Sequence, residues 1–213
     1  MARKPKEQSD KTYDLLLDAA EQVFSENGYA NTTLQEIAER AGLTRGAIYW
    51  HFRDKAQLLD ALLEDVQLPW DRLPKQFVSL EQAPSPKELG EIISQAVQET
   101  VDDSRQHRIT LILLKRTEVV SDDHPAHRRL VAILDRIKNY LTVALSARFR
   151  QQDGTPHSNV PVAVAGVKAY VSGMVSHWVM KPAETDLTVM AFTIERLIFA
   201  LFEPGNLKVQ RSR

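Results

Sequence analysis

A short run of side chains, residues 44–51, combines chemical groups that bind nucleic acid. Arg45 carries a planar fork of N–H donors that fits the N7 and O6 acceptors of a guanine edge, and Tyr49 and His51 can hydrogen-bond phosphates or bases. Gly46 has no side chain, so the backbone beside it can come close to a partner. We therefore expect this run to be a surface that reads the major groove of duplex DNA.

Residues 33–41 are predicted to form the first of two short helices that position this run. Their apolar residues recur at the i, i+3, i+4 and i+7 spacing of one helix face: Leu34, Ile37, Ala38 and Ala41. Thr33 and Glu36 have the spacing of a capping box, in which the two side chains satisfy backbone amides at the helix start. The N-terminus of this helix is therefore well defined.

A turn of about three residues should join this helix to the second one, as in helix-turn-helix units. Gly42 suits the positive φ with which a chain leaves a helix, and Thr44 can cap the helix that follows. Leu43 and Ile48 have the spacing of a hydrophobic staple, which fixes the angle at which the chain enters the second helix.

The second helix then divides into an inward apolar face and an outward polar one. We expect Arg45, Gly46, Tyr49 and Trp50 to approach or read bases. We expect Thr33, Thr44, His51 and Lys55 to hold phosphates.

Residues 33–55 resemble the DNA-binding domain of the TetR family of transcriptional regulators. The resemblance is carried by Leu-Thr-Arg-Gly-Ala-Ile-Tyr-Trp-His-Phe at 43–52, by Lys55, and upstream by Ala19, Ala20, Phe24 and Gly28. The opening Met-Ala-Arg-Lys-Pro-Lys and the run at 44–52 are similar to the subgroup that represses multidrug efflux pump genes. The resemblance implies an all-α homodimer of about nine helices per chain. It also implies a three-helix DNA-binding domain at 1–54 and a larger ligand-binding and dimerisation domain at 55–213.

The apolar periodicity of the rest of the chain also indicates helices only. We expect a polar, disordered or DNA-touching tail at 1–10, an irregular proline-rich junction at 69–86, and helices at 11–27, 55–68, 86–103, 107–119, 125–149, 160–180 and 185–202.

The composition excludes several classes of protein. The formal net charge of −1 argues against non-specific coating of nucleic acid, and the absence of cysteine excludes disulfides and thiolate sites. No apolar stretch is long enough to span a membrane, so we expect a cytoplasmic protein with no membrane partner. No motif of a hydrolase, phosphate-binding loop or zinc protease is found, so neither an enzyme nor a cofactor is expected.

One acidic and histidine-rich segment, residues 122–127, could ligate a divalent metal. A capped helix start explains it better, because Pro125 suits a first helical turn and the acids favour the helix dipole. No metal site is therefore predicted.

The resemblance also implies an inducer pocket within the C-terminal helices, for a small hydrophobic ligand. The candidate lining residues are Trp70, Phe77, Ile93, Ala96, Val97, Thr110, Leu111, Leu114, Tyr140, Leu141, Val171, Met174, Val175 and Trp178. For any one of them, plain core packing is the competing interpretation. Where many members of the family carry Asp-Gly, this chain has Ser172 and Gly173, so an acidic anchor for the ligand is missing.

The last two predicted helices carry more apolar surface than one subunit needs, which suggests a dimer built as a four-helix bundle. The candidate contacts are Ala169, Gly173, Phe192, Leu197 and Leu201. The resemblance implies the same arrangement.

These observations predict a repressor that occupies a double-stranded DNA operator. A bound ligand would act through residues 55–68, expected to be the only rigid connection to the DNA-reading helices. Two alternatives stay open. One is a similar regulator without a small-molecule inducer, released by a partner protein or acting as an activator. The other is a helical ligand-binding protein that does not bind DNA.

Overall fold

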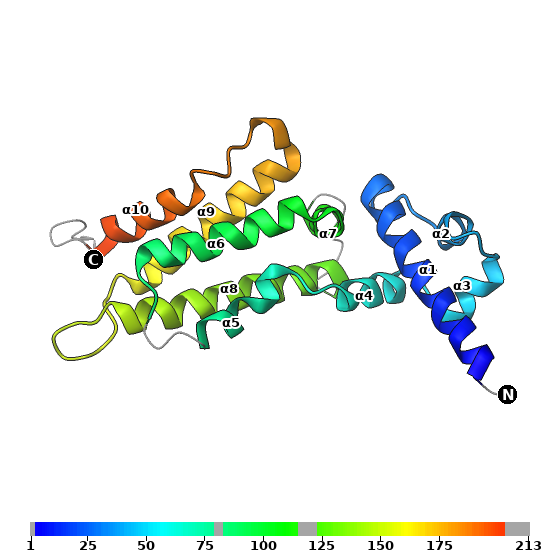
Figure 1. Ribbon diagram of the computed structural model, residues 1–213, viewed down its shortest axis with the longest axis horizontal. Coiled ribbons are helices and arrows are strands. Elements are labelled where there is room, and N and C mark those ends of the chain that lie inside the picture. Colours follow the sequence, from blue (N-terminus) through cyan, green and yellow to red (C-terminus); the bar gives the residue numbers. More distant parts are fainter. Residues whose placement is uncertain (1–2, 79–82, 115–122, 203–213) are drawn as a thin grey trace. The chain divides into compact units, whose positions relative to one another are not determined.

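The computed structural model describes the backbone of residues 3–78, 83–114 and 123–202, and the side chains of those residues except 3–6 and 74–78 (Figure 1). These ranges form ten α-helices, one short 3-10 helix and no strand beyond an isolated bridge between Arg150 and Pro156. The helices are α1 (Arg3–Asn27), α2 (Leu34–Arg40), α3 (Arg45–His51), α4 (Lys55–Asp65), α5 (Pro69–Val78), α6 (Pro86–Asp102), α7 (Ser104–Leu114), α8 (Pro125–Arg148), α9 (Val160–Met180), η1 (Pro182–Glu184) and α10 (Met190–Phe202). The all-α prediction is confirmed, with ten α-helices in place of about nine.

Helix α1 begins at Arg3, so the expectation of a disordered tail over residues 1–10 was wrong for most of that segment. Pro5 does not prevent this, because the first turn of a helix has no intrahelical partner for its N–H groups.

Helix α5 occupies the segment that was expected to be an irregular junction. Its start is defined by Asp71, whose carboxylate accepts a hydrogen bond from the Leu68 amide at 2.9 Å, while Pro69 takes the first helical position. The predicted junction was therefore wrong at its N-terminal half, because local capping outweighed the proline content.

Several helices have different bounds from those predicted: α4 ends at Asp65 instead of Leu68, and α7 begins at Ser104 instead of His107. Helix α10 begins at Met190 instead of Thr185, because the Asp186 carboxylate accepts from the amide and hydroxyl of Thr188 and so forms a local turn that competes with the helix. Helix α7 is described to Leu114, and the predicted continuation to Val119 lies outside the described residues.

The chain divides into two compact units. The first contains residues 1–67 and 103–132, which means α1 to α4, α7 and the beginning of α8. The second contains residues 68–102 and 133–213. A boundary after residue 54 remains a prediction, and the contacts of the first unit extend through α4 and include α7.

The first unit is held together by α1, which packs against α2, α3, α4 and α7. Leu16 and Phe24 of α1 are fully buried, as are Ile37 of α2, Ile48 of α3 and Leu59 of α4. Burying each such side chain contributes roughly 1.5–3 kcal/mol. These apolar contacts fix the two short helices α2 and α3, which would not be stable alone.

In the second unit, α6 and α10 pack so closely that only glycine fits at one position. A Cβ atom on Gly90 would lie 2.4 Å from the backbone oxygen of Ala191. Helix α9 also packs against α10, where a Leu197 methyl would meet a Cβ on Gly166 at 3.4 Å. Helix α10 is therefore closely packed against both α6 and α9.

Candidate nucleic-acid interface

The first helix of the reading unit, α2, has the predicted capping box. The Thr33 amide donates to the Glu36 carboxylate at 2.7 Å, and the Glu36 amide donates to the Thr33 hydroxyl at 3.2 Å. These hydrogen bonds, from the Thr33 backbone and then its hydroxyl, lower the pKa of Glu36. The box fixes the N-terminus of α2 and leaves Thr33 exposed at the surface.

The turn between α2 and α3 has the predicted geometry. Gly42 has a φ of +69°, the Leu43 amide returns to the Ala38 carbonyl at 2.8 Å, and the Thr44 hydroxyl accepts from the Ala47 amide at 3.3 Å. The direction of α3 is thus set by a backbone hydrogen bond before the helix and a side-chain cap at its start.

Helix α3 buries Ile48 and presents most of its other side chains to solvent. Tyr49 is 48% exposed and Trp50 is 83% exposed. Large aromatic side chains with this exposure contribute little to the fold, so their presence on one short helix indicates a surface for a partner.

Two features of α3 favour close approach to a nucleic acid. The Arg45 guanidinium lies over the Tyr49 ring at 5.5 Å, which orients its N–H donors. A Cβ atom on Gly46 would have only the Thr44 hydroxyl within 4 Å, at 3.9 Å, so the fold itself does not require glycine there.

His51 is half-buried, whereas Arg45, Tyr49 and Trp50 are exposed. Its ring packs edge-on against Tyr13 of α1, with 5.9 Å between centroids, and Tyr13 also packs against Phe52 at 5.2 Å. Only part of the His51 ring is available to a phosphate.

The Lys55 side chain, which was predicted to hold a phosphate, makes its contacts within the fold in this structure. Its Nζ donates to the carbonyls of Tyr29 at 2.5 Å and Thr32 at 2.7 Å, and more weakly to that of Ala30 at 3.3 Å. Its ammonium also lies 4.3 Å from the centroid of the Tyr29 ring, and burial lowers its pKa. Lys55 therefore ties α4 to the turn between α1 and α2, and its phosphate contact remains a prediction.

The sequence interpretation missed a set of polar residues on α1. Gln8, Ser9 and Thr12 line an open hollow together with Ala47, Trp50 and His51 of α3. Their i, i+1 and i+4 spacing on a helix could have indicated this face, but residues 1–10 were expected to be disordered. The hollow brings hydroxyl and amide groups next to the reading helix.

Comparison with known proteins places this geometry in a family. Residues 16–62 match the family model described as "Bacterial regulatory proteins, tetR family". The chain is 36% identical over 188 residues to the probable HTH-type transcriptional regulator ArpR of Pseudomonas putida, covering 88% of this chain and 89% of the relative. The chain belongs to the TetR family.

Two solved structures resemble this TetR-family chain. NalD, described as the secondary repressor of the MexAB-OprM multidrug efflux pump in Pseudomonas aeruginosa, has a TM-score of 0.71 and 30% identity, covering 92% of this chain and 96% of NalD. A SmeT–triclosan complex has a TM-score of 0.71 and 27% identity, with the same coverage. The chain is therefore a helix-turn-helix, DNA-binding transcriptional regulator.

In this TetR-family chain, the predicted inducer-binding residues of the second unit are mostly core residues. Trp70, Ile93, Ala96, Val97, Tyr140, Leu141, Val171, Val175 and Trp178 are buried, and Met174 is half-buried. Thr110, Leu111 and Leu114 lie on α7, which belongs to the first unit, and the Phe77 side chain lies outside the described part. Burial raises the pKa of Tyr140, which therefore stays neutral.

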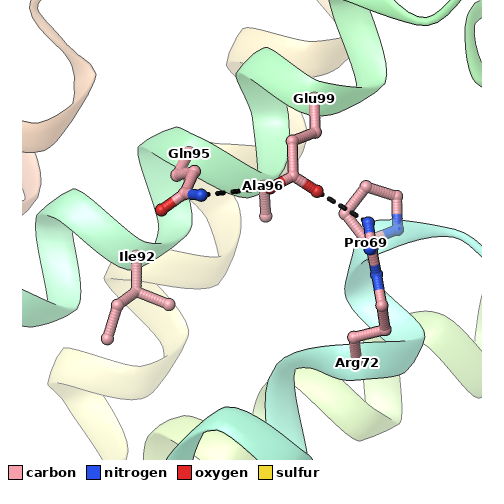
Figure 2. A pocket seen from close by; sticks show the side chains of 6 residues that line it. All are labelled: Pro69, Arg72, Ile92, Gln95, Ala96 and Glu99. Carbon is pink, nitrogen blue, oxygen red and sulfur yellow. Dashed lines mark hydrogen bonds and ion pairs between the residues drawn. The ribbon is translucent and has the colours of Figure 1, made fainter.

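A small hollow of the second unit lies between the start of α5 and the middle of α6 (Figure 2). It is lined by Pro69, Arg72, Ile92, Gln95, Ala96 and Glu99, and Ala96 is one of the predicted lining residues. Arg72 and Glu99 form an ion pair of 2.6 Å, and Gln95 donates to the same carboxylate at 3.1 Å. This polar, ion-paired hollow does not suit a hydrophobic ligand.

The predicted dimerisation residues fall into two groups. Ala169 and Gly173 are exposed on one face of α9, and Phe192 of α10 is 64% exposed. Leu197 instead packs toward Gly166 within the same chain, and Leu201 uses its carbonyl to accept from the Asn159 amide at 2.6 Å. The first group is exposed to solvent, whereas the second helps to hold α9 and α10 together.

The described residues contain no group of three or more histidine, cysteine or acidic side chains placed to bind a metal ion, and Asp122 lies outside them. None of their helices is both long and apolar enough to cross a membrane.

Proposed function

We propose that this TetR-family regulator represses a multidrug efflux operon and leaves its operator when a small hydrophobic compound binds its C-terminal helices. The observation that carries the proposal is the exposed face of α3, where Arg45, Tyr49 and Trp50 project beside Gly46 without a role in the fold. The efflux assignment is supported by the titles of the structural neighbours NalD and SmeT, which are repressors of efflux pumps.

In this proposal α3 lies in the major groove. Arg45 donates two hydrogen bonds to a guanine edge, and the Trp50 indole contacts thymine methyl groups. Thr33, Thr44, Tyr49 and the accessible part of His51 bind phosphates, together with backbone amides at the starts of α3 and of α4, beside Lys55. These contacts fix the register and read the sequence at the same time.

The protein acts as a homodimer in this proposal, through α9 and α10. The exposed residues Ala169, Gly173 and Phe192 support it, because a Cβ on Gly173 would meet nothing within 4 Å and another helix can approach there closely. A two-fold dimer presents its two α3 helices to half-sites about 34 Å, or one helical turn, apart. A roughly palindromic operator follows from this symmetry.

The ligand would enter the buried apolar part of the second unit, around Trp70, Ile93, Val97, Tyr140 and Trp178. Because these side chains are packed in the described structure, the ligand must favour a conformer in which they separate. It shifts the population only as far as it prefers that conformer. The SmeT–triclosan complex supports a small hydrophobic ligand and provides a first compound to test.

The proposal is tested by fluorescence anisotropy with the DNA upstream of the protein's own gene. Binding that is sequence-selective and weakens steeply with salt supports it, because phosphate contacts release counterions. Arg45→Ala should abolish specific binding, whereas Arg148→Ala, a charge-matched change in the second unit, should leave it unchanged. Indifference to DNA would instead support a helical ligand-binding protein, and DNA binding that no hydrophobic compound weakens would support a regulator released in another way.

A further inference from the structure

Glu21 of α1 is a carboxylate in the apolar core of the first unit. Its side chain is 3% exposed, between buried Leu17 and Phe24. A buried ionised carboxylate costs several kcal/mol unless charged partners and hydrogen bonds compensate for lost water. The Glu21 carboxylate can therefore be buried at this position only if cationic side chains bind it.

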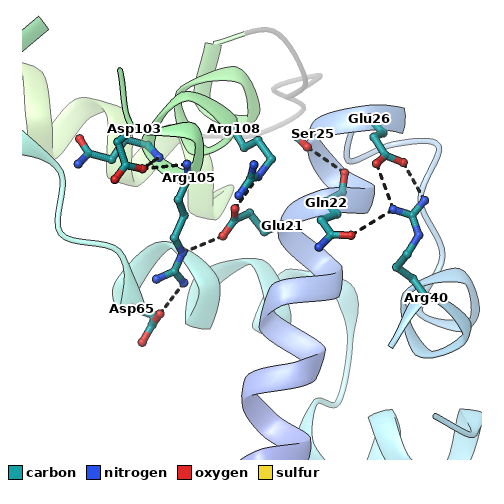
Figure 3. Close-up of polar contacts among 10 residues, drawn as sticks. Glu21, Gln22, Ser25, Glu26, Arg40, Asp65, Asp103, Arg105 and Arg108 are labelled. Carbon is teal, nitrogen blue, oxygen red and sulfur yellow. Dashed lines mark hydrogen bonds and ion pairs between the residues drawn. The ribbon is translucent and has the colours of Figure 1, made fainter. Parts of the chain in front are cut away.

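Both oxygens of Glu21 are bound by arginines of α7 (Figure 3). The Arg105 Nε donates to Oε2 at 2.9 Å, and the Arg108 Nε donates to Oε1 at 2.7 Å. The i, i+3 spacing brings both guanidinium groups to the same face of α7. A second Arg105 nitrogen donates to Asp65, the last residue of α4, at 2.8 Å. The first turn of α7 is thus bound to α1 and to the end of α4.

This ion-paired cluster connects α7 to the reading helix α3 through α1. Glu21 and Tyr13 lie on the same helix, and eight residues of α-helix span about 12 Å. Tyr13 packs against His51 and Phe52, at the C-terminal end of α3. A displacement of α7 can therefore be transmitted to α3 by α1, without a contribution from α4.

Helix α7 is also joined to the second unit by a very short connection. Only Asp103 separates the end of α6 at Asp102 from the start of α7 at Ser104. Asp103 accepts from the amides of Arg105 and Gln106 and so caps α7. The expectation that residues 55–68 are the only rigid connection to the reading helices is therefore incomplete, because α6 continues almost directly into a helix of the DNA-binding unit.

We propose that Glu21 is a positioning residue for operator binding. By holding Arg105 and Arg108, it fixes α7 on α1, so that a movement of α6 changes the position of α1 and α3. The inference rests on the proposed function, but the mechanical connection can be measured without DNA or inducer.

The chain offers a matched control on the same helix. Glu26 of α1 forms a two-pronged ion pair with Arg40 of α2, at 2.7 and 3.0 Å. Both side chains are partly exposed, and the ion pair joins α1 to α2 without involving α7. Glu26→Gln therefore makes the same chemical change as Glu21→Gln at a site that does not connect to α7.

The first experiment measures a distance within one chain. Because the protein has no cysteine, Gln35→Cys on α2 and Lys87→Cys on α6 can be spin-labelled selectively, and both positions are exposed. Labelled protein is diluted with unlabelled protein so that distances between chains do not contribute. We expect a broader distance distribution in Glu21→Gln and in Arg108→Gln, which leaves Glu21 bound to Arg105, and no change in Glu26→Gln. An unchanged distribution in both of the first two variants, with their folding verified by circular dichroism, would overturn the proposal.

The second experiment measures operator affinity of the same variants on the DNA upstream of the gene. We expect Glu21→Gln to weaken binding about tenfold, within the usual range of coupling between sites, and Glu26→Gln to weaken it much less. Wild-type affinity in Glu21→Gln would contradict the positioning role. Absence of DNA binding by the wild type would contradict the proposed function instead, and the distance measurement would still decide whether Glu21 holds α7.

Discussion

The guanidinium carbon of Arg45 lies 5.5 Å from the centroid of the Tyr49 ring, one turn further along α3. Both side chains are exposed, so the pair exists without help from the protein core. An arginine side chain has about 2 kcal/mol of rotamer entropy, and stacking on an aromatic ring reduces what is lost on binding. Tyr49 thus restricts the orientation of the Arg45 guanidinium before DNA binds, which suits the guanine contact proposed for Arg45.

Tyr49→Leu should therefore lower operator affinity and also discrimination at the guanine that Arg45 reads. An exposed cation–π contact is worth about 0.5–1 kcal/mol, which corresponds to a two- to fivefold loss. Tyr49→Phe keeps the ring but loses the hydroxyl, so it should keep discrimination and lose only affinity from the phosphate contact. Anisotropy titrations against the operator and a guanine-substituted operator separate the two effects. Equal discrimination by the leucine and phenylalanine variants would exclude the positioning role of the ring.

Gly46→Ala should stabilise the protein while weakening DNA binding. Alanine favours a helix over glycine by about 0.5–1 kcal/mol, and the added Cβ would meet nothing closer than the Thr44 hydroxyl at 3.9 Å. A methyl group on the face that approaches DNA would nevertheless collide with the groove. Gly90→Ala is the contrast, since its Cβ would lie 2.4 Å from the Ala191 oxygen, and it should destabilise the second unit. Thermal unfolding and gel-shift assays of both variants test these two predictions. Tighter DNA binding by Gly46→Ala would contradict the proposed position of α3 in the major groove.

Lys55→Met should lower the free energy of unfolding of the protein. It removes the donor that serves the carbonyls of Tyr29 and Thr32, and leaving such groups without a partner costs about 1–3 kcal/mol. Urea unfolding should show this loss, whereas Gln35→Met, on an exposed surface of α2, should show almost none. If Lys55→Met kept full stability and only lost operator affinity, the side chain would have the phosphate role that the sequence predicted.

The reading unit could be predicted from the sequence because its signals are local. The capping box of Thr33 and Glu36, the turn at Gly42 and the cap at Thr44 each depend on residues three or four positions apart. The same local rules failed at Asp186, where a side chain forms a turn and delays the start of α10.

Interactions between distant residues were not visible in the sequence. Glu21 appeared as one acid among several on α1, yet it binds two arginines more than eighty residues away. Lys55 matched the family pattern, but its carbonyl partners lie more than twenty residues earlier in the chain. Burial and partner choice at these positions depend on tertiary packing, which periodicity does not encode.

Phe192→Asp should produce a monomer. The Phe192 ring is 64% exposed on α10, and a carboxylate there would lose its water without gaining a partner in the proposed dimer interface. Val143→Asp is the control, since Val143 is 72% exposed on α8, away from the proposed interface. Light scattering after size exclusion should give a monomer for the first variant and a dimer for the second. A dimeric Phe192→Asp protein would mean that other surfaces form the interface.

His124 should make the first unit less stable in mild acid. Its ring packs edge-on against Tyr29 at 4.6 Å, both of its nitrogens are buried without a hydrogen bond, and Lys55, His127 and Arg128 surround it. Burial, and then the charges of Arg128, His127 and Lys55, lower the pKa of His124 below its ordinary value of 6.5. The unfolded chain therefore binds a proton at a higher pH than the folded chain, and stability is lost as the pH falls from about 6.5 toward the lowered pKa.

His124→Phe keeps an aromatic ring against Tyr29 and removes this loss, so the stability difference between pH 7.5 and pH 5.5 should become smaller. An identical pH profile for wild type and His124→Phe in urea unfolding would show that His124 does not titrate as its surroundings require.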